Sequence, residues 1–297
     1  GTSLGNYYLL AATDTQSQQR ESNELNNGTS FAITIVAQLP ELVVTAAQAP
    51  ETIVLGSSFN VNWTVANQGA IAAAGSSIND AVYVSQDPVW DAADAFLAYV
   101  STSTQFPLAA GGSYDESVTI WQAGNSWYRD LVASGALLGD RYLLVVADYE
   151  KRISDGDLDN NVYSVPMQFV APDLTVTELN APASAVLNQA ITVSWSVLNQ
   201  GTVAAAGPLY DSLYLSEDPT FDASDVFAAS IHLQHAPLAS GGTYTASATF
   251  AVPNAGTGTR YLIAVADRRV ELDGTITTYT PEADETNNYL AVPMTLS

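Results

Sequence analysis

The sequence of 297 residues has no cysteine, two histidines and few basic residues, with 8 Lys and Arg against 31 Asp and Glu. The absence of cysteine excludes disulfide bonds, thiolate metal sites and cysteine nucleophiles. The formal net charge of −23 at pH 7 disfavours nucleic acids and anionic membranes as partners, because both are negatively charged. No apolar run approaches the roughly 18 residues of a membrane-spanning helix, so we expect no membrane insertion.

The excess of acidic residues leaves two interpretations open. Acidic side chains make divalent cations natural partners, and they equally serve to keep a secreted protein in solution. Disorder is not expected, because hydrophobic residues make up 47% of the chain and include 15 Tyr and 5 Trp. The length and apolar content together suit two or three packed domains.

One stretch occurs twice, as Val61–Gly69 (VNWTVANQG) and Val193–Gly201 (VSWSVLNQG). Both copies alternate apolar and polar residues around a tryptophan and end in Asn-Gln-Gly. They lie 132 residues apart (193 − 61), as do Pro40 and Pro172, each of which is followed by an acidic residue and leucine. The pattern indicates two complete repeats, joined by short proline-containing linkers that are stiffer than Gly/Ser tethers.

The beginning of the chain matches the end of a repeat. Residues 6–14 (NYYLLAATD) align with 140–148 (DRYLLVVAD) at an offset of 134 (140 − 6). We therefore expect three parts: residues 1–38 as the C-terminal strand pair of a preceding partial repeat, 40–170 as the first repeat with an aromatic insertion at 121–138, and 172–297 as the second repeat.

Within each repeat, apolar residues recur at every second position, which is the period of a half-buried strand. About seven short strands per repeat, separated by Gly, Pro and Asn turns, predict an all-β chain of tandem immunoglobulin-like β-sandwiches. The expected strands lie near 42–47, 58–66, 79–85, 95–101, 113–121, 140–147 and 162–169 in the first repeat, near 173–178, 190–198, 210–216, 226–232, 243–252, 259–266 and 289–296 in the second, and near 5–13 and 28–37 in the partial repeat.

Four motifs together resemble the CARDB repeats, a family named for cell adhesion in bacteria. They are the opening Pro-[Asp/Glu]-Leu, the tryptophan strand with its Asn-Gln-Gly end, Tyr-[Val/Leu]-Ser-x-Asp, and Glu-x-x-Glu-x-Asn-Asn. The first repeat departs from the last motif, with Asp155 in place of its first glutamate. The resemblance implies an immunoglobulin-like fold for both full repeats.

The same resemblance implies a structural function. We expect extender modules of a bacterial cell-surface adhesin or extracellular filament, located outside the cell. The expected partners are neighbouring repeats of the same protein, with a host surface protein or glycan as a further class.

The first acidic group recurs in both full repeats as Asp-Pro-x-[Trp/Phe]-Asp-Ala-x-Asp. The three carboxylates share one face if the segment makes a helical turn. Convergent oxygens suit Ca²⁺, which takes about six to eight hard ligands. Alternatively, the first aspartate caps a short helix that has proline at its first position, and the later acids are solvated. The residues are Asp87, Asp91, Asp94, Asp218, Asp222 and Asp225.

The second acidic group lies between the last two strands of each repeat. Its aspartates in the first repeat alternate as in the first half of a calcium loop, but the later bidentate glutamate of an EF-hand is missing, so an EF-hand is excluded. The group is either a calcium-binding loop or a polar hairpin whose Asn pair bonds the backbone of its turn. The residues are Asp148, Asp155, Asp157 and Asp159; Asp267, Glu282, Asp284 and Glu285; and Asp14, Glu21, Asn23 and Glu24 in the partial repeat.

The immunoglobulin-like topology predicts where these acids lie. The third strand pairs antiparallel with the sixth, which puts Asp80 and Asp211, at the start of the third strand, near the second acidic group. The first acidic group is then expected at the opposite end of its repeat, where Asp87, Asp91 and Asp94 approach the end of the next repeat that holds Asp211 and Asp267. We predict that Ca²⁺ at these acids, Asp80 and Asp211 included, stiffens the joint.

Two sets of aromatic residues have different expected roles. Trp63 and Trp195 stand among alternating aliphatic residues and are expected in the two cores. The aromatic insertion contributes Trp121, Trp127 and Tyr128, which either fold onto the sandwich as a lid or bind a glycan or protein. Ligand binding by this insertion is the alternative function.

No pattern indicates catalysis. His232 and His235 stand outside the repeat and lack the third ligand of a zinc site. There is no phosphate-cradling glycine loop and no nucleophile elbow. We expect a protein that is not an enzyme and has neither catalytic nor organic-cofactor residues. A further alternative, an accessory module of a secreted hydrolase, needs catalytic sequence elsewhere.

Overall fold

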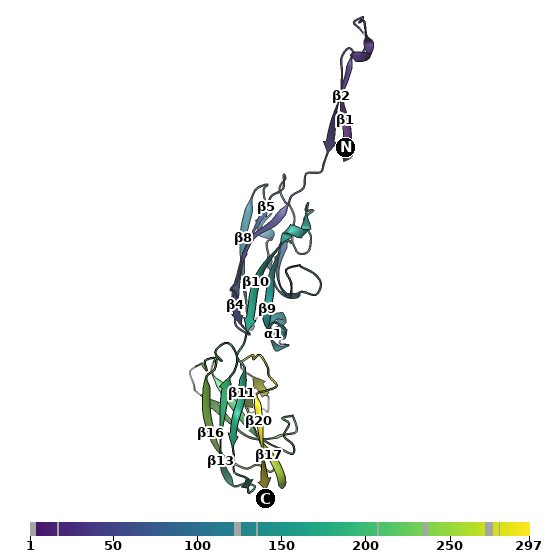
Figure 1. Cartoon of the computed structure of the whole chain (residues 1–297). Helices are drawn as coiled ribbons and strands as arrows, with labels where there is room; N and C mark the ends of the chain where they lie inside the picture. Colours follow the sequence, from purple (N-terminus) through teal and green to yellow (C-terminus); the bar gives the residue numbers. More distant parts are fainter. Residues whose placement is uncertain are drawn as a thin grey trace.

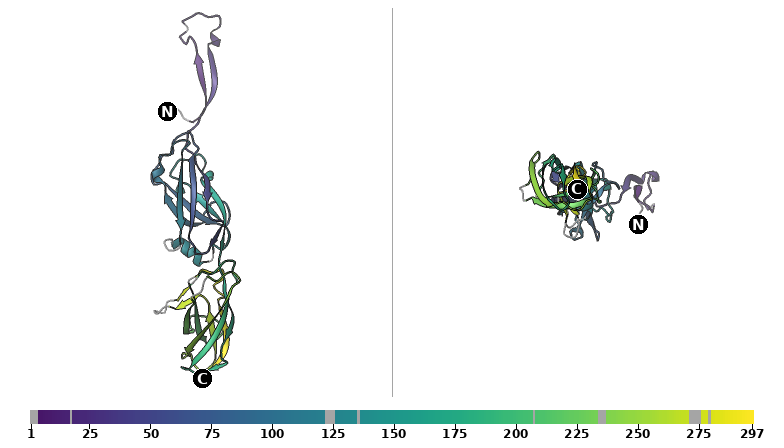
Figure 2. Two further views of the ribbon diagram at one scale, coloured as in Figure 1. Left: turned by 90° about the vertical axis from the view of Figure 1, so that its left-hand side faces the viewer. Right: turned by 90° about the horizontal axis from the view of Figure 1, so that it is seen from below.

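The computed structural model describes residues 4–16, 18–121, 126–134, 136–206, 208–233, 237–270, 276–278 and 280–297. A hairpin of β1 (Gly5–Ala12) and β2 (Gly28–Ile35), the first repeat and the second repeat follow one another along an elongated molecule (Figure 1). A view at right angles shows the same arrangement (Figure 2). The predicted all-β fold is confirmed, with a helix, α1 (Ser126–Ala133), inside the aromatic insertion.

The first repeat is a sandwich of a three-stranded and a five-stranded sheet. Both sheets are antiparallel except at the edge, where the short β4 pairs in parallel with β10. In order across the two sheets, the strands are β3 (Leu42–Gln48), β5 (Phe59–Asn67) and β8 (Ser113–Ile120), and then β4 (Thr52–Val54), β10 (Val162–Val170), β9 (Gly139–Val146), β6 (Asn79–Ser85) and β7 (Ala95–Ser101).

The second repeat has the same two sheets in the same order. It adds a small hairpin after its sixth long strand, made of β18 (Arg268–Val270) and β19 (Ile276–Thr278). The strands of the sandwich are β11 (Leu174–Asn180), β13 (Ala190–Asn199) and β16 (Thr243–Ala251), and then β12 (Ser184–Ala185), β20 (Tyr289–Leu296), β17 (Gly258–Val265), β14 (Leu209–Ser216) and β15 (Val226–Leu233).

The alternation in the sequence explains how each sandwich is filled. In β5, Val61, Trp63 and Val65 are buried while the residues between them are exposed or half-buried, and β13 repeats the pattern. Trp63 and Trp195 are 2% and 1% exposed, so their predicted core positions are confirmed. The inward face of each three-stranded sheet thus packs against the five-stranded sheet.

Each core tryptophan also bonds a buried carboxylate. Trp63 Nε1 donates to Asp80 Oδ2 over 2.9 Å, and the Tyr114 hydroxyl donates to the same carboxylate over 3.0 and 3.2 Å. Burial raises the pKa of Asp80 to about 6, although these hydrogen bonds oppose the shift. The core is therefore partly polar, with a charge-bearing group at the centre of a hydrogen-bonded cluster. The equivalent residues of the second repeat are Trp195, Asp211 and Tyr244.

The aromatic insertion folds onto the sandwich. Tyr128, on α1, is 0% exposed, its ring meets Phe59 edge-on with centroids 6.0 Å apart, and its hydroxyl donates to the Ser57 carbonyl over 3.0 Å. Tyr128 therefore belongs to a lid that is folded onto the sandwich. It is not displayed to a ligand, because its ring is buried in the core. Trp121 is 55% exposed, and the Trp127 side chain lies outside the described residues.

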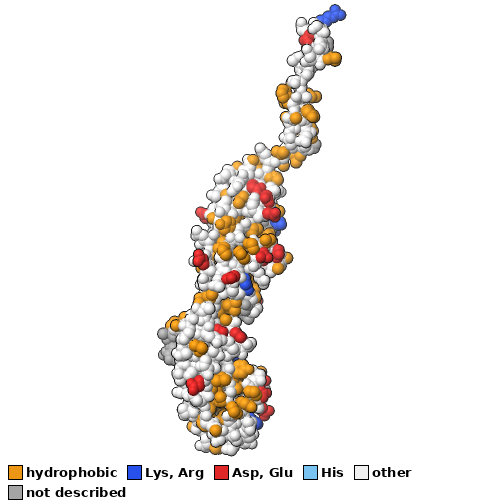
Figure 3. All heavy atoms as spheres, viewed as in Figure 1, with side chains coloured by type: hydrophobic (Ala, Val, Ile, Leu, Met, Phe, Trp, Pro, Cys, Tyr) orange, Lys and Arg blue, Asp and Glu red, His pale blue; other side chains and the backbone are white. Residues whose placement is uncertain are grey.

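The hairpin β1–β2 exposes positions that the full repeats bury. Its two strands pair in the same antiparallel way as β9 and β10. Leu9 and Phe31 are 58% and 56% exposed, whereas Leu143, the counterpart of Leu9, is 0% exposed. Figure 3 shows apolar side chains spread over the hairpin surface. The hairpin thus has the structure of the last strand pair of a repeat.

We expect Tyr114→Phe to lower the free energy of unfolding of the first repeat by about 1–3 kcal/mol, because the buried Asp80 carboxylate would lose a donor. Tyr163→Phe is the control, since this ring of the same repeat is 37% exposed and the change should have a much smaller effect. Urea denaturation of the full chain, followed by fluorescence, measures both. Equal losses would show that the Tyr114 hydroxyl does not have this role.

Candidate functional site

Two kinds of acidic loop recur in the full repeats. The β6–β7 loop covers residues 86–94, and its counterpart between β14 and β15 covers 217–225. The acidic turn covers residues 147–161 between β9 and β10, and 266–288 between β17 and β20, where 271–275 and 279 are not described. These loops contain all the predicted calcium ligands of the two full repeats except Asp80 and Asp211.

The carboxylates of the β6–β7 loop bond to the backbone of their own loop. Asp87 Oδ1 accepts from Val89 N over 2.8 Å, and Asp91 Oδ1 accepts from Ala93 N over 2.7 Å. Asp94 Oδ2 accepts from Asp91 N over 2.7 Å. The loop consists of bends and turns, so the helical turn considered for these acids is wrong, and the carboxylates act as caps of backbone N–H groups. The second repeat has the same contacts at Asp218, Asp222 and Asp225.

The β6–β7 loop folds over the outer face of its own five-stranded sheet. Trp90 packs on Tyr83 with ring centroids 5.8 Å apart, and Lys151 Nζ lies 5.7 Å from the Trp90 centroid. The loop and the acidic turn together line a hollow of about 770 Å³, to which Asp94 and Asp159 both belong. The loop leaves β6 at Ser85, which pairs with Tyr142 near the start of β9, so it begins at the predicted end of the repeat, opposite to the acidic turn. It then folds back along the sheet, where the aromatic–cation contact holds it.

The second repeat shows the same arrangement. Arg268 Cζ lies 4.5 Å from the Phe221 ring centroid, and Arg268 Nε donates to the Tyr214 hydroxyl over 3.2 Å. The Asp211 carboxylate accepts from Trp195 and Tyr244, and the Asp267 carboxylate accepts from Thr280 N, all within this repeat. Both aspartates are 0% exposed, so the predicted approach of Asp87, Asp91 and Asp94 to their carboxylates is wrong.

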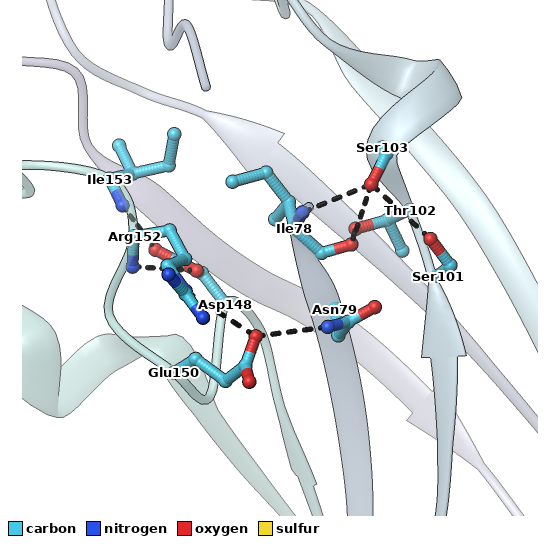
Figure 4. Close-up of polar contacts among 9 residues, drawn as sticks. All are labelled: Ile78, Asn79, Ser101, Thr102, Ser103, Asp148, Glu150, Arg152 and Ile153. Carbon is cyan, nitrogen blue, oxygen red and sulfur yellow. Dashed lines mark hydrogen bonds and ion pairs between the residues drawn. The ribbon is translucent and has the colours of Figure 1, made fainter. Parts of the chain in front are cut away.

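The acidic turn starts from the core carboxylate. Asp148 N donates to Asp80 Oδ1 over 3.1 Å, which confirms the predicted proximity of the third strand to this turn. The Asp148 carboxylate accepts from Arg152 N over 2.9 Å and from Ile153 N over 2.6 Å, so it shapes the turn around itself (Figure 4). The same left-handed backbone opens all three copies of the turn, with φ of 41° at Asp14, 43° at Asp148 and 45° at Asp267.

The middle of the acidic turn reaches the first strand of its own repeat. Asp155 Oδ2 accepts from Leu42 N over 3.0 Å and from Asn161 Nδ2 over 3.1 Å. Asn160 Nδ2 donates to Glu41 Oε1 over 2.5 Å. The turn therefore fastens the point where the chain enters the repeat.

Glu282 takes the equivalent place in the second repeat. Its carboxylate accepts from Leu174 N and, over 3.1 Å, from Asn288 Nδ2, while Asn287 Nδ2 donates to Asp173 Oδ1 over 2.9 Å. Burial, with the nearby Asp267 carboxylate, raises the pKa of Glu282 to about 9 although the Leu174 N–H opposes the shift. Burial also raises the pKa of Asp267 to about 6. Without a positive charge beside them, these buried carboxyl groups therefore favour their neutral, protonated form more than exposed ones do.

The other predicted ligands of the acidic turn lie apart from the buried carboxylates of Asp155 and Glu282, or beside them. Asp157 and Asp284 are exposed and cap their own loops, accepting from Asp159 N over 3.0 Å and from Thr286 N over 2.8 Å. Glu285 Oε1 accepts from Glu282 N over 3.1 Å. Among the described residues, no group of three or more His, Cys, Asp or Glu side chains is placed to hold a metal ion. Any cation site here therefore needs amide or backbone oxygens as well.

Two features lie beyond the sequence reasoning. Asn161 and Asn288 join the carboxylate cluster through their side chains, whereas the interpretation of the repeated Asn-Asn pair had assigned them to the turn backbone. His232 stacks on Tyr210 with ring centroids 4.4 Å apart, and His235 lies outside the described residues. The repetition of Asn-Asn in all three copies was the signal for the first feature.

The fold and the acidic turns define a class of protein: tandem β-sandwich modules whose last hairpin closes on the first strand. The CARDB family model matches residues 39–165 and 171–292. The chain belongs to the CARDB family, as the motifs of the sequence indicated.

Solved structures that match the chain include a CARDB domain from Pyrococcus furiosus in complex with di-metal ions, 17% identical, with a TM-score of 0.29 over 42% of this chain and 94% of that domain. A solution structure of the same domain has 17% identity and a TM-score of 0.29, over 42% and 95%. Red sea bream transglutaminase is 16% identical with a TM-score of 0.29, over 88% of this chain and 32% of the enzyme. Curated protein sequences give no significant match.

We expect Asp155→Ala, in metal-free buffer, to speed hydrogen exchange of the Leu42 amide at least tenfold, because that N–H loses its acceptor (about 1.4 kcal/mol corresponds to tenfold). Asp157→Ala, two residues away on an exposed side chain, is the control and should leave Leu42 exchange unchanged. Exchange measured by NMR or mass spectrometry tests this. An unchanged rate in Asp155→Ala would contradict the proposed fastening of the first strand.

Proposed function

We propose that the chain is a tandem extender of a bacterial cell-surface adhesin or extracellular filament, whose modules hold their neighbours in fixed directions. The elongated, in-line arrangement of the parts supports this function (Figure 2). Membership of the CARDB family supports a non-catalytic module. In the described part of the chain, no helix is long and apolar enough to cross a membrane.

The observation that carries the proposal is the fixed entry into each repeat. We call residues 39–41 and 171–173 the entry segments. Glu41 N donates to Asn67 Oδ1 over 3.1 Å, and Gln68 N donates to the Glu41 carbonyl over 2.7 Å. The acidic turn bonds the other side, through Leu42 N. The entry segment is thus held from two sides, so the linker has little freedom to bend.

The Asn-Gln-Gly turn fits against the entry segment without space for a side chain. A Cβ at Gly69 would lie 2.5 Å from Glu41 N, and a Cβ at Gly201 would lie 2.5 Å from Asp173 N. Asn199 Oδ1 accepts from Asp173 N over 3.1 Å. The Asn-Gln-Gly motif, which marks the repeats in the sequence, therefore packs against the entry segment and hydrogen-bonds to it.

Calcium at the acidic loops belongs to the same proposal. A net charge of −23 makes a divalent cation a favourable counter-ion. A cation would neutralise the acidic turn and so strengthen its hold on the entry segment. The alternative function is ligand binding by the aromatic insertion. Among its described aromatic side chains only Trp121 is exposed to a ligand, because Tyr128 is buried in the core.

We expect Gly201→Ala to loosen the joint between the repeats, because the entry segment must move away from the new methyl group. Small-angle X-ray scattering of the full chain should show an elongated wild type and a broader range of dimensions in the variant. Gly28→Ala is the control, since its Cβ has ordinary contacts, the nearest at 4.0 Å. A compact wild type, or a variant with unchanged dimensions, would contradict the fixed joint.

A further inference from the structure

Buried oxygen atoms without hydrogen-bond donors recur at the equivalent asparagines of the two repeats, and one further such atom lies on an aspartate of each acidic turn. Both asparagines of each Asn-Asn pair have an unpartnered Oδ1, and so does one aspartate of each acidic turn. Asn161 and Asn288 are 3% and 5% exposed, and Asp267 is 0% exposed. Burying an acceptor without a donor is unfavourable, so its repetition calls for a physical cause. The atoms are Oδ1 of Asp155, Asn160, Asn161, Asp267, Asn287 and Asn288.

The orientation of the amides follows from their other contacts. Asn161 Nδ2 donates to Asp155, and Asn288 Nδ2 donates to Glu282, each over 3.1 Å. Turning the Asn161 amide around would place its oxygen against an oxygen of the Asp155 carboxylate, with no proton between the two, and Asn288 takes the equivalent position in the second repeat. The free atom is therefore the oxygen, and the group that it lacks is a donor or a cation.

The cluster around Asn288 is made of oxygen ligands. Asp267 has one carboxylate oxygen bonded to Thr280 N over 2.8 Å and the other unpartnered. Glu282 offers further lone pairs on both oxygens, since a carboxylate oxygen accepts more than one bond. A set of carboxylate and amide oxygens without nitrogen or sulfur suits a hard divalent cation such as Ca²⁺.

The first repeat has the same set. Asp148 stands at the position of Asp267, Asp155 at that of Glu282, and Asn161 at that of Asn288. Asp155 Oδ1 and Asn161 Oδ1 are the unpartnered atoms there. Both oxygens of the Asp148 carboxylate accept backbone N–H groups, from Arg152 and Ile153, so Asp148 would contribute its remaining lone pairs.

We infer that Asp267, Glu282 and Asn288 bind one divalent cation, and that Asp148, Asp155 and Asn161 bind another. This inference rests on the calcium part of the proposed function and gives it a location. Each site lies within one repeat, where Asp155 or Glu282 also holds the first strand. The cation acts on the joint indirectly, by fixing the carboxylate that grips the entry segment. The acids of the β6–β7 loop are not part of it, because their oxygens cap their own backbone.

Calorimetric titration of the EDTA-treated, dialysed full chain with CaCl₂ tests the sites. We expect about two ions per chain, one for each full repeat. Asn288→Leu keeps the size of the side chain and removes the amide oxygen, and it should weaken the second-repeat site roughly tenfold or more. The double variant Asn161→Leu/Asn288→Leu should lose both sites. If the leucine variants do not fold, Asp267→Asn takes their place, because it keeps the shape of the side chain and should likewise weaken calcium binding at the second-repeat site.

Asp91→Asn and Asp222→Asn are the controls for Asp267→Asn, because each also removes one negative charge, but from an exposed loop position. Calcium binding that is lost in these controls and kept in Asn161→Leu and Asn288→Leu would overturn the assigned sites, although the chain would still bind calcium. No heat of binding in the wild type would overturn the sites together with the calcium part of the function, with ordered water as the partner of the free oxygens. Filled sites with scattering that is identical in calcium and EDTA would leave the sites valid and contradict stiffening.

Discussion

A single carboxylate in each repeat joins the end of the domain to its beginning. Asp155 accepts the backbone N–H of Leu42, the first residue of β3, and Glu282 does the same for Leu174 in β11. The partners are 113 and 108 residues apart in sequence, so the contact closes the whole repeat. A hydrogen bond is electrostatically stronger in the protein interior than in water. The position of the incoming chain depends on this bond.

The remaining features of the joint are arranged around that contact. The Asn-Gln-Gly turn approaches the entry segment from the side opposite to the acidic turn, and its asparagine accepts the backbone N–H of Glu41 or Asp173. The buried Trp–Asp–Tyr cluster fixes the start of the acidic turn through Asp148 N. Hydrogen bonds from Trp63 to Ile153, the backbone from Ile153 to Asp155, and the bond from Leu42 N to Asp155 thus connect the core tryptophan with the linker. The tryptophan is packed in the core and also orients the joint.

The sequence predicts the fold well, because alternation and repeat spacing are local signals. It does not predict β4 and β12, since strands of three and two residues are too short to show a period. It does not predict that the β6–β7 loop folds back along the sheet, because the contact of Trp90 with Lys151 joins residues far apart in sequence. It names Asp155 and Glu282 but cannot separate them from exposed acids such as Asp157. That distinction depends on burial, which the tertiary structure determines.

The central claim is that the two repeats keep a fixed relative direction. Because the chain has no cysteine, Ser117→Cys and Ser247→Cys introduce unique positions for spin labels on equivalent exposed sites of the two repeats. Pulsed electron paramagnetic resonance then measures the distribution of distances between the labels. A single narrow distribution in calcium is the predicted result. A broad distribution, as wide as that of a flexible tether, would contradict the account.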